Sequence, residues 1–222
     1  MAARKIKARL AYEPSDPESR NALLPHLVTI VQERAAAAVC KACPLWRNAT
    51  QTVFGEGDDH ASYVIVGEQP GDKEDLAGKP FVGPAGGMLR KAMDEAGLDI
   101  DKGYVTNAVK HFKFERRGKR RIHSKPGTKE IKACYPWLKR ELELIQPKFV
   151  LVLGSTAVTA VFGKAGTIAK LRGKAITLAG GVKAIVTVHP SSLLRIPDKL
   201  AKEAAYKMFV KDLKLLKRQL AA

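Results

Sequence analysis

His123 ends a basic run, GKRRIHS (118–124), of a kind that is usually a solvated loop in contact with phosphate. An imidazole with one unprotonated nitrogen is a nucleophile when that nitrogen faces an electrophilic carbon. The preceding Lys119, Arg120 and Arg121 are of the kind that contacts phosphate. The alternative is a solvated histidine that only contacts phosphate in a basic loop. The run therefore predicts a polyanionic ligand, and by itself leaves the chemical role of His123 open.

Two glycine-rich segments carry further candidates. GEQPG (67–71) presents Glu68 and Gln69 in a tight turn whose backbone N–H groups can face a ligand. Phe81 lies in a loop rich in glycine and proline, where a stiffly held ring can stack on a planar ligand. The alternatives are an ordinary strand-to-helix turn for the first segment and a core phenylalanine for the second.

The segment HPSSLLR (189–195) follows an expected buried strand. His189 at the strand end can donate a hydrogen bond to an anion that forms there, or it can be a core histidine with satisfied nitrogens. Ser191, Ser192 and Arg195 suit contacts to phosphate oxygens.

The elements that must position these residues alternate along the chain. A helix from Leu27 to about Val39 is expected to lead to the CxxC pair, Ser155 is expected to cap a later helix, and Pro136 is expected to kink or split another. We expect strands at 62–67, 104–107, 149–154 and 183–188, and helices at 84–98, 128–145, 156–163 and 198–220, the last capped by Asp198.

This alternation predicts an α/β fold of three layers, α/β/α, around a four-stranded and mostly parallel sheet. Ligands of such sheets bind outside the carboxyl ends of the strands. Topology therefore brings GEQPG, Asn107 with the basic loop after it, and HPSSLLR to one edge of the sheet. We expect residues 26–222 to form a single domain and residues 1–25 to be a basic, poorly ordered arm.

The composition points to a globular nucleic-acid-binding protein. Of the 222 residues, 45% are hydrophobic, and 39 Lys and Arg against 22 Asp and Glu give a net charge of +17. Such an excess favours a polyanionic partner, most commonly nucleic acid. An apolar stretch long enough to span a membrane is missing from the sequence, and the basic start lacks the apolar core of a secretory signal. We expect a cytoplasmic protein that associates with DNA, with a mitochondrial address as a weaker alternative.

Four segments in this order, GEQPGDKEDLAGKPFVGPAGGMLRKA, YVTNAVKHFKF, GKRRIHS and VHPSSLLR, resemble the uracil-DNA glycosylase superfamily. They are most similar to its iron–sulfur branch, close to family 4, and within it to the covalent uracil-DNA-binding type, UdgX. The resemblance covers about residues 38–217, and its most specific part is the KRRIH segment, which ordinary members lack.

The resemblance implies a role for each candidate. Gln69 would lie near the uracil, Phe81 would stack on its ring, and Asn107 would hydrogen-bond its N3–H and O4. His189 would stabilise negative charge at O2 as the base leaves, and His123 would capture C1′ of the sugar. Glu68 would accept the Nδ1 proton of His123 and leave Nε2 free to attack. Lys119, Arg120, Arg121, Ser191, Ser192 and Arg195 would contact the DNA, with Arg121 also shaping the loop.

The resemblance also implies a 4Fe–4S cluster, for which the chain offers three cysteines. The implied ligands are Cys40, Cys43, Cys134 and, as the fourth, His111. His111 stands in TNAVKH, where ordinary iron–sulfur members have cysteine. Histidine can replace cysteine on iron. The same four ligands would suit a structural zinc, and His26 and His60 are competing ligands. We expect the bound group to have a structural role.

We therefore expect an enzyme that cleaves the N-glycosidic bond of uracil in DNA, single-stranded or flipped out, and that stays covalently linked to the sugar. The alternatives are a uracil-DNA glycosylase that turns over with water, and a non-catalytic nucleic-acid-binding iron–sulfur protein. Nothing in the sequence suggests an obligate dimer, so we expect a monomer.

Overall fold

The computed structural model describes residues 29–163 and 165–222. The expected N-terminal arm (1–25), the start of the first expected helix at Leu27, and His26 lie outside these described residues. Six strands form one sheet in the order β1-β3-β2-β6-β8-β7. The four expected strands are its parallel centre: β3 (Tyr104–Asn107), β2 (Tyr63–Gly67), β6 (Phe149–Leu153) and β8 (Lys183–Thr187).

The predicted α/β/α architecture is confirmed, and the sheet is wider than expected. Two short strands that the sequence analysis missed, β1 (Glu56–Gly57) and β7 (Ala175–Thr177), pair antiparallel at its edges. Each is too short to show the alternation by which a strand is recognised. Their pairing leaves the parallel order of the central strands unchanged.

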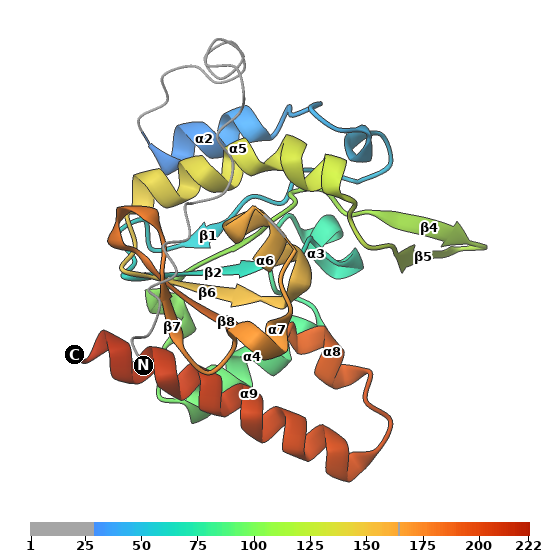
Figure 1. Ribbon diagram of the computed structural model, residues 1–222. Helices are drawn as coiled ribbons and strands as arrows, with labels where there is room; N and C mark the ends of the chain where they lie inside the picture. The colour runs from blue at the N-terminus through green and yellow to red at the C-terminus, as the bar shows by residue number, and fades with distance from the viewer. Residues whose placement is uncertain (1–28, 164) are drawn as a thin grey trace.

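Alternation along the central strands separates two apolar layers. Val64 and Val66 of β2 pack with α2 (Ile30–Ala37), α5 (Thr128–Ile145) and α6 (Gly154–Phe162). Ile65 faces the opposite side and packs with α4 (Pro84–Glu95), α8 (Pro190–Leu194) and α9 (Lys199–Leu220). Figure 1 shows α2 and α5 over one face of the sheet and α4 and α9 over the other. Both faces of the sheet are covered, and β2 and β6 are accordingly apolar along their whole length.

Of the two outcomes expected at Pro136, a kink or a split, the split does not occur, and the expected cap at Ser155 is wrong. Pro136 does not split α5, because buried residues on both sides of it, Cys134 and Leu138 among them, hold the helix against the sheet as one element. Ser155 does not cap α6, which already begins at Gly154. Gly154 has a φ of 86° and turns the chain directly from strand into helix, so no separate capping residue intervenes. Asp198 caps α9 as predicted, accepting a hydrogen bond from the Ala201 N–H at 2.7 Å.

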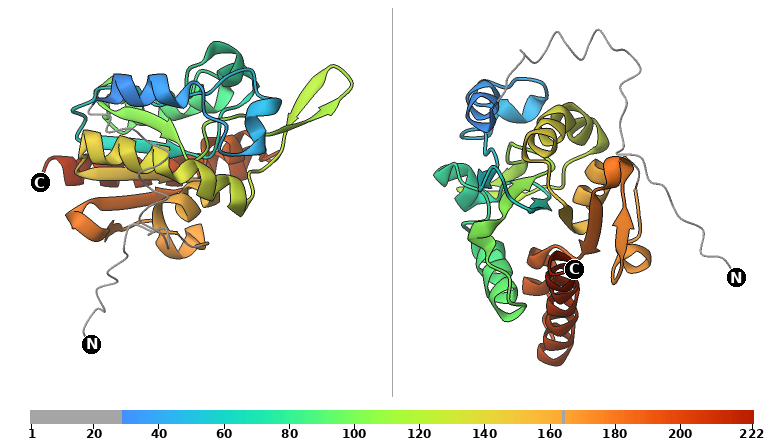
Figure 2. Two further views of the ribbon diagram at one scale, coloured as in Figure 1. Left: turned by 90° about the horizontal axis from the view of Figure 1, so that it is seen from above. Right: turned by 90° about the vertical axis from the view of Figure 1, so that its left-hand side faces the viewer.

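The basic segment is a β-hairpin rather than an irregular loop. Strand β4 (Phe114–Arg117) pairs antiparallel with β5 (Arg120–His123), so that Phe114 lies opposite His123. Gly118, with a φ of 58°, makes the turn. The hairpin projects from the body of the protein beside the carboxyl ends of the parallel strands (Figures 1 and 2). His123 is therefore held at the base of an ordered element.

The remaining elements are short connections. These connecting elements are η1 (Pro44–Arg47), α3 (Asp72–Ala77), η2 (Ile100–Lys102), α7 (Ile168–Leu171) and η3 (Ala179–Gly181).

None of the helices within the described residues is both long and apolar enough to cross a membrane.

Candidate active site

A cavity of about 950 Å³ lies at the carboxyl ends of β2, β3, β6 and β8. Topology predicted this convergence, and the structure brings nine of the predicted site residues into the cavity wall. These nine are Glu68, Gln69, Phe81, Asn107, His123, His189, Ser191, Ser192 and Arg195.

The Glu68 carboxylate and the His123 imidazole lie within hydrogen-bond distance at the base of the hairpin. His123 Nε2 lies 3.0 Å from Glu68 Oε1, and the Thr156 hydroxyl donates to Glu68 Oε2 at 2.5 Å. Burial by itself would raise the pKa of Glu68, but these two hydrogen bonds outweigh it and the pKa is lowered. Glu68 is therefore a carboxylate at neutral pH, ready to hold a proton of His123. Thr156 was missed, although its segment was expected at this edge of the sheet.

The nitrogen of His123 that faces Glu68 differs from the sequence-based expectation. Nε2 rather than Nδ1 contacts the carboxylate, so Nδ1 carries the free lone pair in this ring orientation. Nε2 is the ring nitrogen farther from the backbone, so the imidazole extends from the hairpin toward Glu68, which directly follows β2. Rotation of the ring about Cβ–Cγ exchanges each nitrogen with a ring carbon, so it would not bring Nδ1 to the place that Nε2 now occupies. Glu68 therefore holds Nε2, and Nδ1 is the nitrogen left free.

His189 is a neutral hydrogen-bond donor. Its Nδ1 accepts the backbone N–H of Ser191 at 3.2 Å and lies 2.8 Å from the Ser191 hydroxyl. An accepting Nδ1 places the ring proton on Nε2. Burial lowers the pKa of His189 to about 4, so the ring is uncharged at neutral pH. The N-cap of α8 thus fixes the tautomer that donates from Nε2.

Asn107 and Phe81 meet over Gly67. A Cβ placed on Gly67 would lie 2.4 Å from Asn107 Oδ1 and 2.6 Å from Phe81 Cζ. Phe81 has a φ of 55°, an uncommon conformation for a bulky residue that concentrates at functional sites. Its ring centroid lies 6.0 Å from that of His189. The ring, the amide and the imidazole are therefore packed into one small region.

Gly67→Ala is expected to reduce activity at this site by about 100-fold, because a displacement of about 1 Å in a positioning group has that effect. The new methyl group must push aside Asn107, Phe81 or both. The matched control is Gly87→Ala in α4, where an added Cβ meets nothing within 4 Å. Single-turnover base release from a uracil-containing oligonucleotide measures both variants. Equal rates for the two would contradict the packing argument.

Gln69 holds the hairpin instead of offering its amide to a ligand. Its Nε2 donates to the carbonyls of Lys113 and Ser124, both at 3.1 Å, and its Oε1 accepts the Lys113 N–H at 3.1 Å. Lys113 precedes β4 and Ser124 follows β5, so one side chain ties the two ends of the hairpin together. The prediction that Gln69 lies near the pocket agrees with the structure, while its side-chain amide is occupied by the hairpin.

Gln69→Ala is expected to slow any reaction that depends on His123 by about tenfold and to leave base release nearly unchanged, since the loss of three hydrogen bonds loosens the hairpin base. Timed denaturing gels would separate the two steps by resolving protein-linked DNA from abasic DNA. A uniform reduction of both steps would indicate that Gln69 supports the whole pocket instead.

Arg121 is bound to carboxylates of α3. Its Nε lies 2.5 Å from Asp72 Oδ1 and its Nη1 lies 2.6 Å from Asp75 Oδ2. These bonds are consistent with its predicted role in shaping the loop, and they occupy the guanidinium with protein carboxylates. Arg116, Lys119 and Arg120 are exposed and line a groove of about 570 Å³ between the hairpin and α3, and Asp72 borders both this groove and the main cavity.

The four predicted metal ligands come from three segments near α5. Lys110 N donates to Cys134 Sγ at 3.1 Å, Trp137 Nε1 donates to Cys40 Sγ at 3.2 Å, and the Leu45 backbone donates to Cys43. The pKa of Cys134 is raised to about 12, chiefly by burial, with Lys110 opposing the increase and charge on Cys43 and Cys40 adding to it. N–H donors on all three sulfurs fit thiolates bound to a metal.

His111, the fourth predicted ligand, is buried, and its Nε2 lies 2.9 Å from Thr52 Oγ1. The competing ligand His60 is exposed beside Asp59. Within residues 29–163 and 165–222, no three His, Cys, Asp or Glu side chains are arranged around a single metal-ion position. The donor chemistry therefore fits a metal group, while the described side chains do not form a preassembled single-ion site.

The fold and the cavity together define an α/β/α protein with a pocket for a planar, hydrogen-bonding ligand at the carboxyl edge of its sheet. A more specific assignment comes from known proteins. The family model of the uracil DNA glycosylase superfamily matches residues 54–214, so the chain belongs to this superfamily.

Several curated relatives are type-4 uracil-DNA glycosylases. That of Thermotoga maritima is 41% identical over 170 residues, covering 76% of this chain and 84% of the relative. That of Sulfurisphaera tokodaii is 38% identical over 167 residues, covering 72% and 73% respectively. That of Saccharolobus solfataricus is 37% identical over 166 residues, covering 71% and 74%.

Proposed function

We propose that this protein excises uracil from DNA and then remains covalently attached, through His123, to C1′ of the sugar that the base has left. Membership of the superfamily and the names of the relatives support cleavage of the N-glycosidic bond at uracil. The observation that carries the covalent step is the pairing of His123 with Glu68 at 3.0 Å in the wall of the same cavity as Asn107 and His189.

Base release breaks the bond between C1′ and N1 of uracil, and the bonding electrons leave with the base. Negative charge develops on uracil at O2, where the Nε2–H of His189 donates. A neutral donor in a pocket partly shielded from water stabilises such charge strongly. The Asn107 amide accepts from N3–H and donates to O4, and the Phe81 ring stacks on the base. The target nucleotide must be unpaired or flipped out to enter.

Capture then occurs at the positively charged sugar. The nitrogen of His123 that Glu68 does not hold donates its lone pair to C1′, and a C–N bond forms. The resulting imidazolium keeps its remaining proton, and the carboxylate of Glu68 balances its charge. The uracil anion takes a proton from solvent. Glu68 is suited to this step because its lowered pKa keeps it ionised.

Further proposals concern the surroundings of the site. Lys119, Arg120, Ser191, Ser192 and Arg195 contact the DNA backbone, and the protein acts as a cytoplasmic monomer. Cys40, Cys43, His111 and Cys134 hold a 4Fe–4S cluster, with zinc as the alternative. When bound, the metal group crosslinks the segments that carry its ligands and supplies no step of the reaction.

A turnover glycosylase is the second candidate, and one observation favours it. The His123 side chain is 44% exposed, so water has access to the same face of the sugar. Water would then capture C1′, leaving an abasic site and free protein. The two candidates share the base-release step and differ only in the group that captures the sugar.

A denaturing gel distinguishes the candidates. The protein is mixed with a single-stranded oligonucleotide that contains one deoxyuridine, and the products are heated in detergent before separation. The covalent proposal predicts a slowly migrating protein–DNA band and an intact mass equal to protein plus the abasic oligonucleotide. Abasic DNA without that band would support turnover. Brown colour and iron in elemental analysis of the purified protein would support the cluster, and zinc in a colourless preparation would contradict it.

A further inference from the structure

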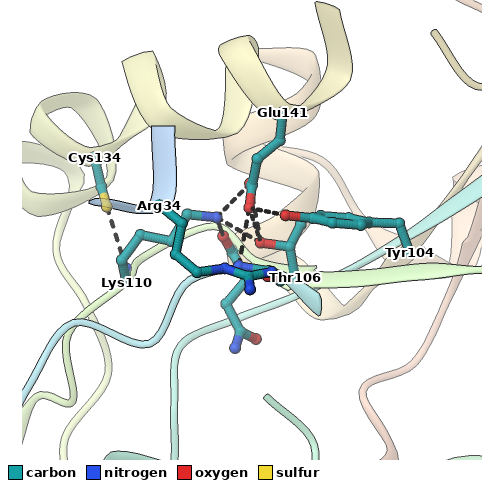
Figure 3. Close-up of polar contacts among 8 residues, drawn as sticks. Arg34, Tyr104, Thr106, Lys110, Cys134 and Glu141 are labelled. Carbon is teal, nitrogen blue, oxygen red and sulfur yellow. Dashed lines mark hydrogen bonds and ion pairs between the residues drawn. The ribbon is translucent and has the colours of Figure 1, made fainter. Parts of the chain in front are cut away.

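Lys110 and Glu141 form a fully buried ion pair beneath the pocket. Lys110 Nζ lies 2.6 Å from Glu141 Oε2, and the two side chains are 1% and 0% exposed. Figure 3 shows Glu141 reaching down from α5 toward Lys110, Thr106 and Tyr104. The pair lies behind β3, on the side of the chain away from the cavity lining. Neither residue was singled out in the sequence as part of the site.

Hydrogen bonds satisfy the carboxylate of Glu141. Its Oε1 accepts from the Tyr104 hydroxyl and from the Gly55 N–H, both at 3.0 Å, and the Thr106 hydroxyl lies 3.0 Å from each oxygen. A buried ion pair is weak evidence for stability, since apolar residues of similar volume are often as stable. A fully satisfied buried network does rigidify its surroundings. The buried network around Glu141 is therefore suited to fixing the geometry of the residues that it contacts.

The geometry that this network fixes is the turn that carries Asn107. Lys110 Nζ donates to the Asn107 carbonyl at 2.8 Å and to the Thr106 hydroxyl at 2.5 Å. On the other side of the turn, the Ala108 and Val109 N–H groups donate to the carbonyls of Gly67 and Glu68, both at 3.0 Å. The turn is thus held from both sides, directly beside the Asn107 amide.

We propose that Lys110 and Glu141 are positioning residues for base recognition, and that they act through Asn107. This inference rests on the proposed role of Asn107 in binding uracil. The ion pair holds the Asn107 carbonyl, so the amide is presented at a fixed distance from the base. Reading a base edge requires such precision, because small displacements of a positioning group cost large factors in rate.

A double-mutant cycle with Asn107 tests the proposal. Lys110→Met/Glu141→Gln removes both charges together, and the glutamine can still accept hydrogen bonds from Gly55 and Tyr104. We expect single-turnover uracil release to slow about 10- to 100-fold in the otherwise unchanged protein. In an Asn107→Ala background, the same change should cost less than about threefold, because the group it positions is already gone.

Two further variants test whether the effect is specific to the Lys110–Glu141 pair. Arg140→Met/Glu33→Gln removes another ion pair of α5, at 2.8 Å, whose carboxylate is also buried, and should leave uracil release within about twofold. Tyr104→Phe removes the hydroxyl that donates to Glu141 and also hydrogen-bonds Arg34, and it serves if the double variant fails to fold. We expect it to slow release about threefold to tenfold, again only when Asn107 is present.

Equal losses with and without Asn107 would show that the pair acts on the fold as a whole, and would overturn the inference. The same conclusion would follow if the Arg140 and Glu33 control slowed release as much as the test variant. An unmodified protein that releases no uracil would instead overturn the proposed function, and this inference with it.

Discussion

His123→Ser is expected to abolish the protein–DNA adduct while uracil release continues. Serine lacks the unprotonated nitrogen that forms the bond to C1′, and its shorter side chain does not reach the place of the ring nitrogens. Removal of the ring also opens space beside Glu68, whose lowered pKa keeps it as a carboxylate that can accept a proton from water. The product should therefore change from protein-linked DNA to free abasic DNA, with repeated turnover.

Denaturing gels and intact-mass measurements on the same reactions would follow both products. The adduct should fall by at least about 1000-fold, in line with the loss of a nucleophile that acts as one unit with its base. His60→Ser is the matched control, because His60 is an exposed histidine beside an acidic residue, as His123 is. An adduct that persists in the His123 variant would assign the linkage to another residue.

The sequence was sufficient to predict the central sheet and nine of the residues that line the pocket. The four parallel strands are mostly apolar, and short apolar runs bounded by turns are recognisable in a sequence. Once these strands were assigned, topology placed Asn107 and His189 at the same edge without any distance information. Both line the cavity in the structure.

The direction of side chains could not be predicted in the same way. Gln69 lies in a tight turn and was expected near the ligand, but its side chain bonds the backbone at both ends of a hairpin that the sequence did not reveal. The orientation of the His123 ring likewise depends on how far the hairpin lies from β2. Such outcomes depend on contacts between residues far apart in the sequence, which periodicity does not encode.

The contacts of charged side chains could not be predicted from the sequence either, as Arg121 and the Lys110–Glu141 pair show. Sequence composition assigned the basic residues of the hairpin to DNA, but two carboxylates of α3 engage Arg121. Lys110 is 1% exposed and does not contribute to the basic surface at all. Net charge therefore predicts the kind of partner, while the structure decides which cations are free to meet it.

His189→Ala is expected to slow uracil release about 100- to 1000-fold, the usual effect of removing one donor from a site of developing negative charge. The adduct should slow by the same factor, since capture by His123 cannot precede departure of the base. Because the pKa of His189 is about 4, its ring remains neutral from pH 6 to pH 8, and its titration should not change the rate of the unmodified protein across that range.

Ser191→Ala is the matched control for His189. It removes the hydroxyl that lies 2.8 Å from Nδ1 but keeps the Ser191 N–H that fixes the tautomer, so release should slow by less than about fivefold. Single-turnover rates measured at saturating protein separate this effect from DNA binding. If His189→Ala released uracil within threefold of the unmodified rate, the base would leave without help from this imidazole, and the charge at O2 would have to be stabilised by backbone N–H groups of the GEQPG turn.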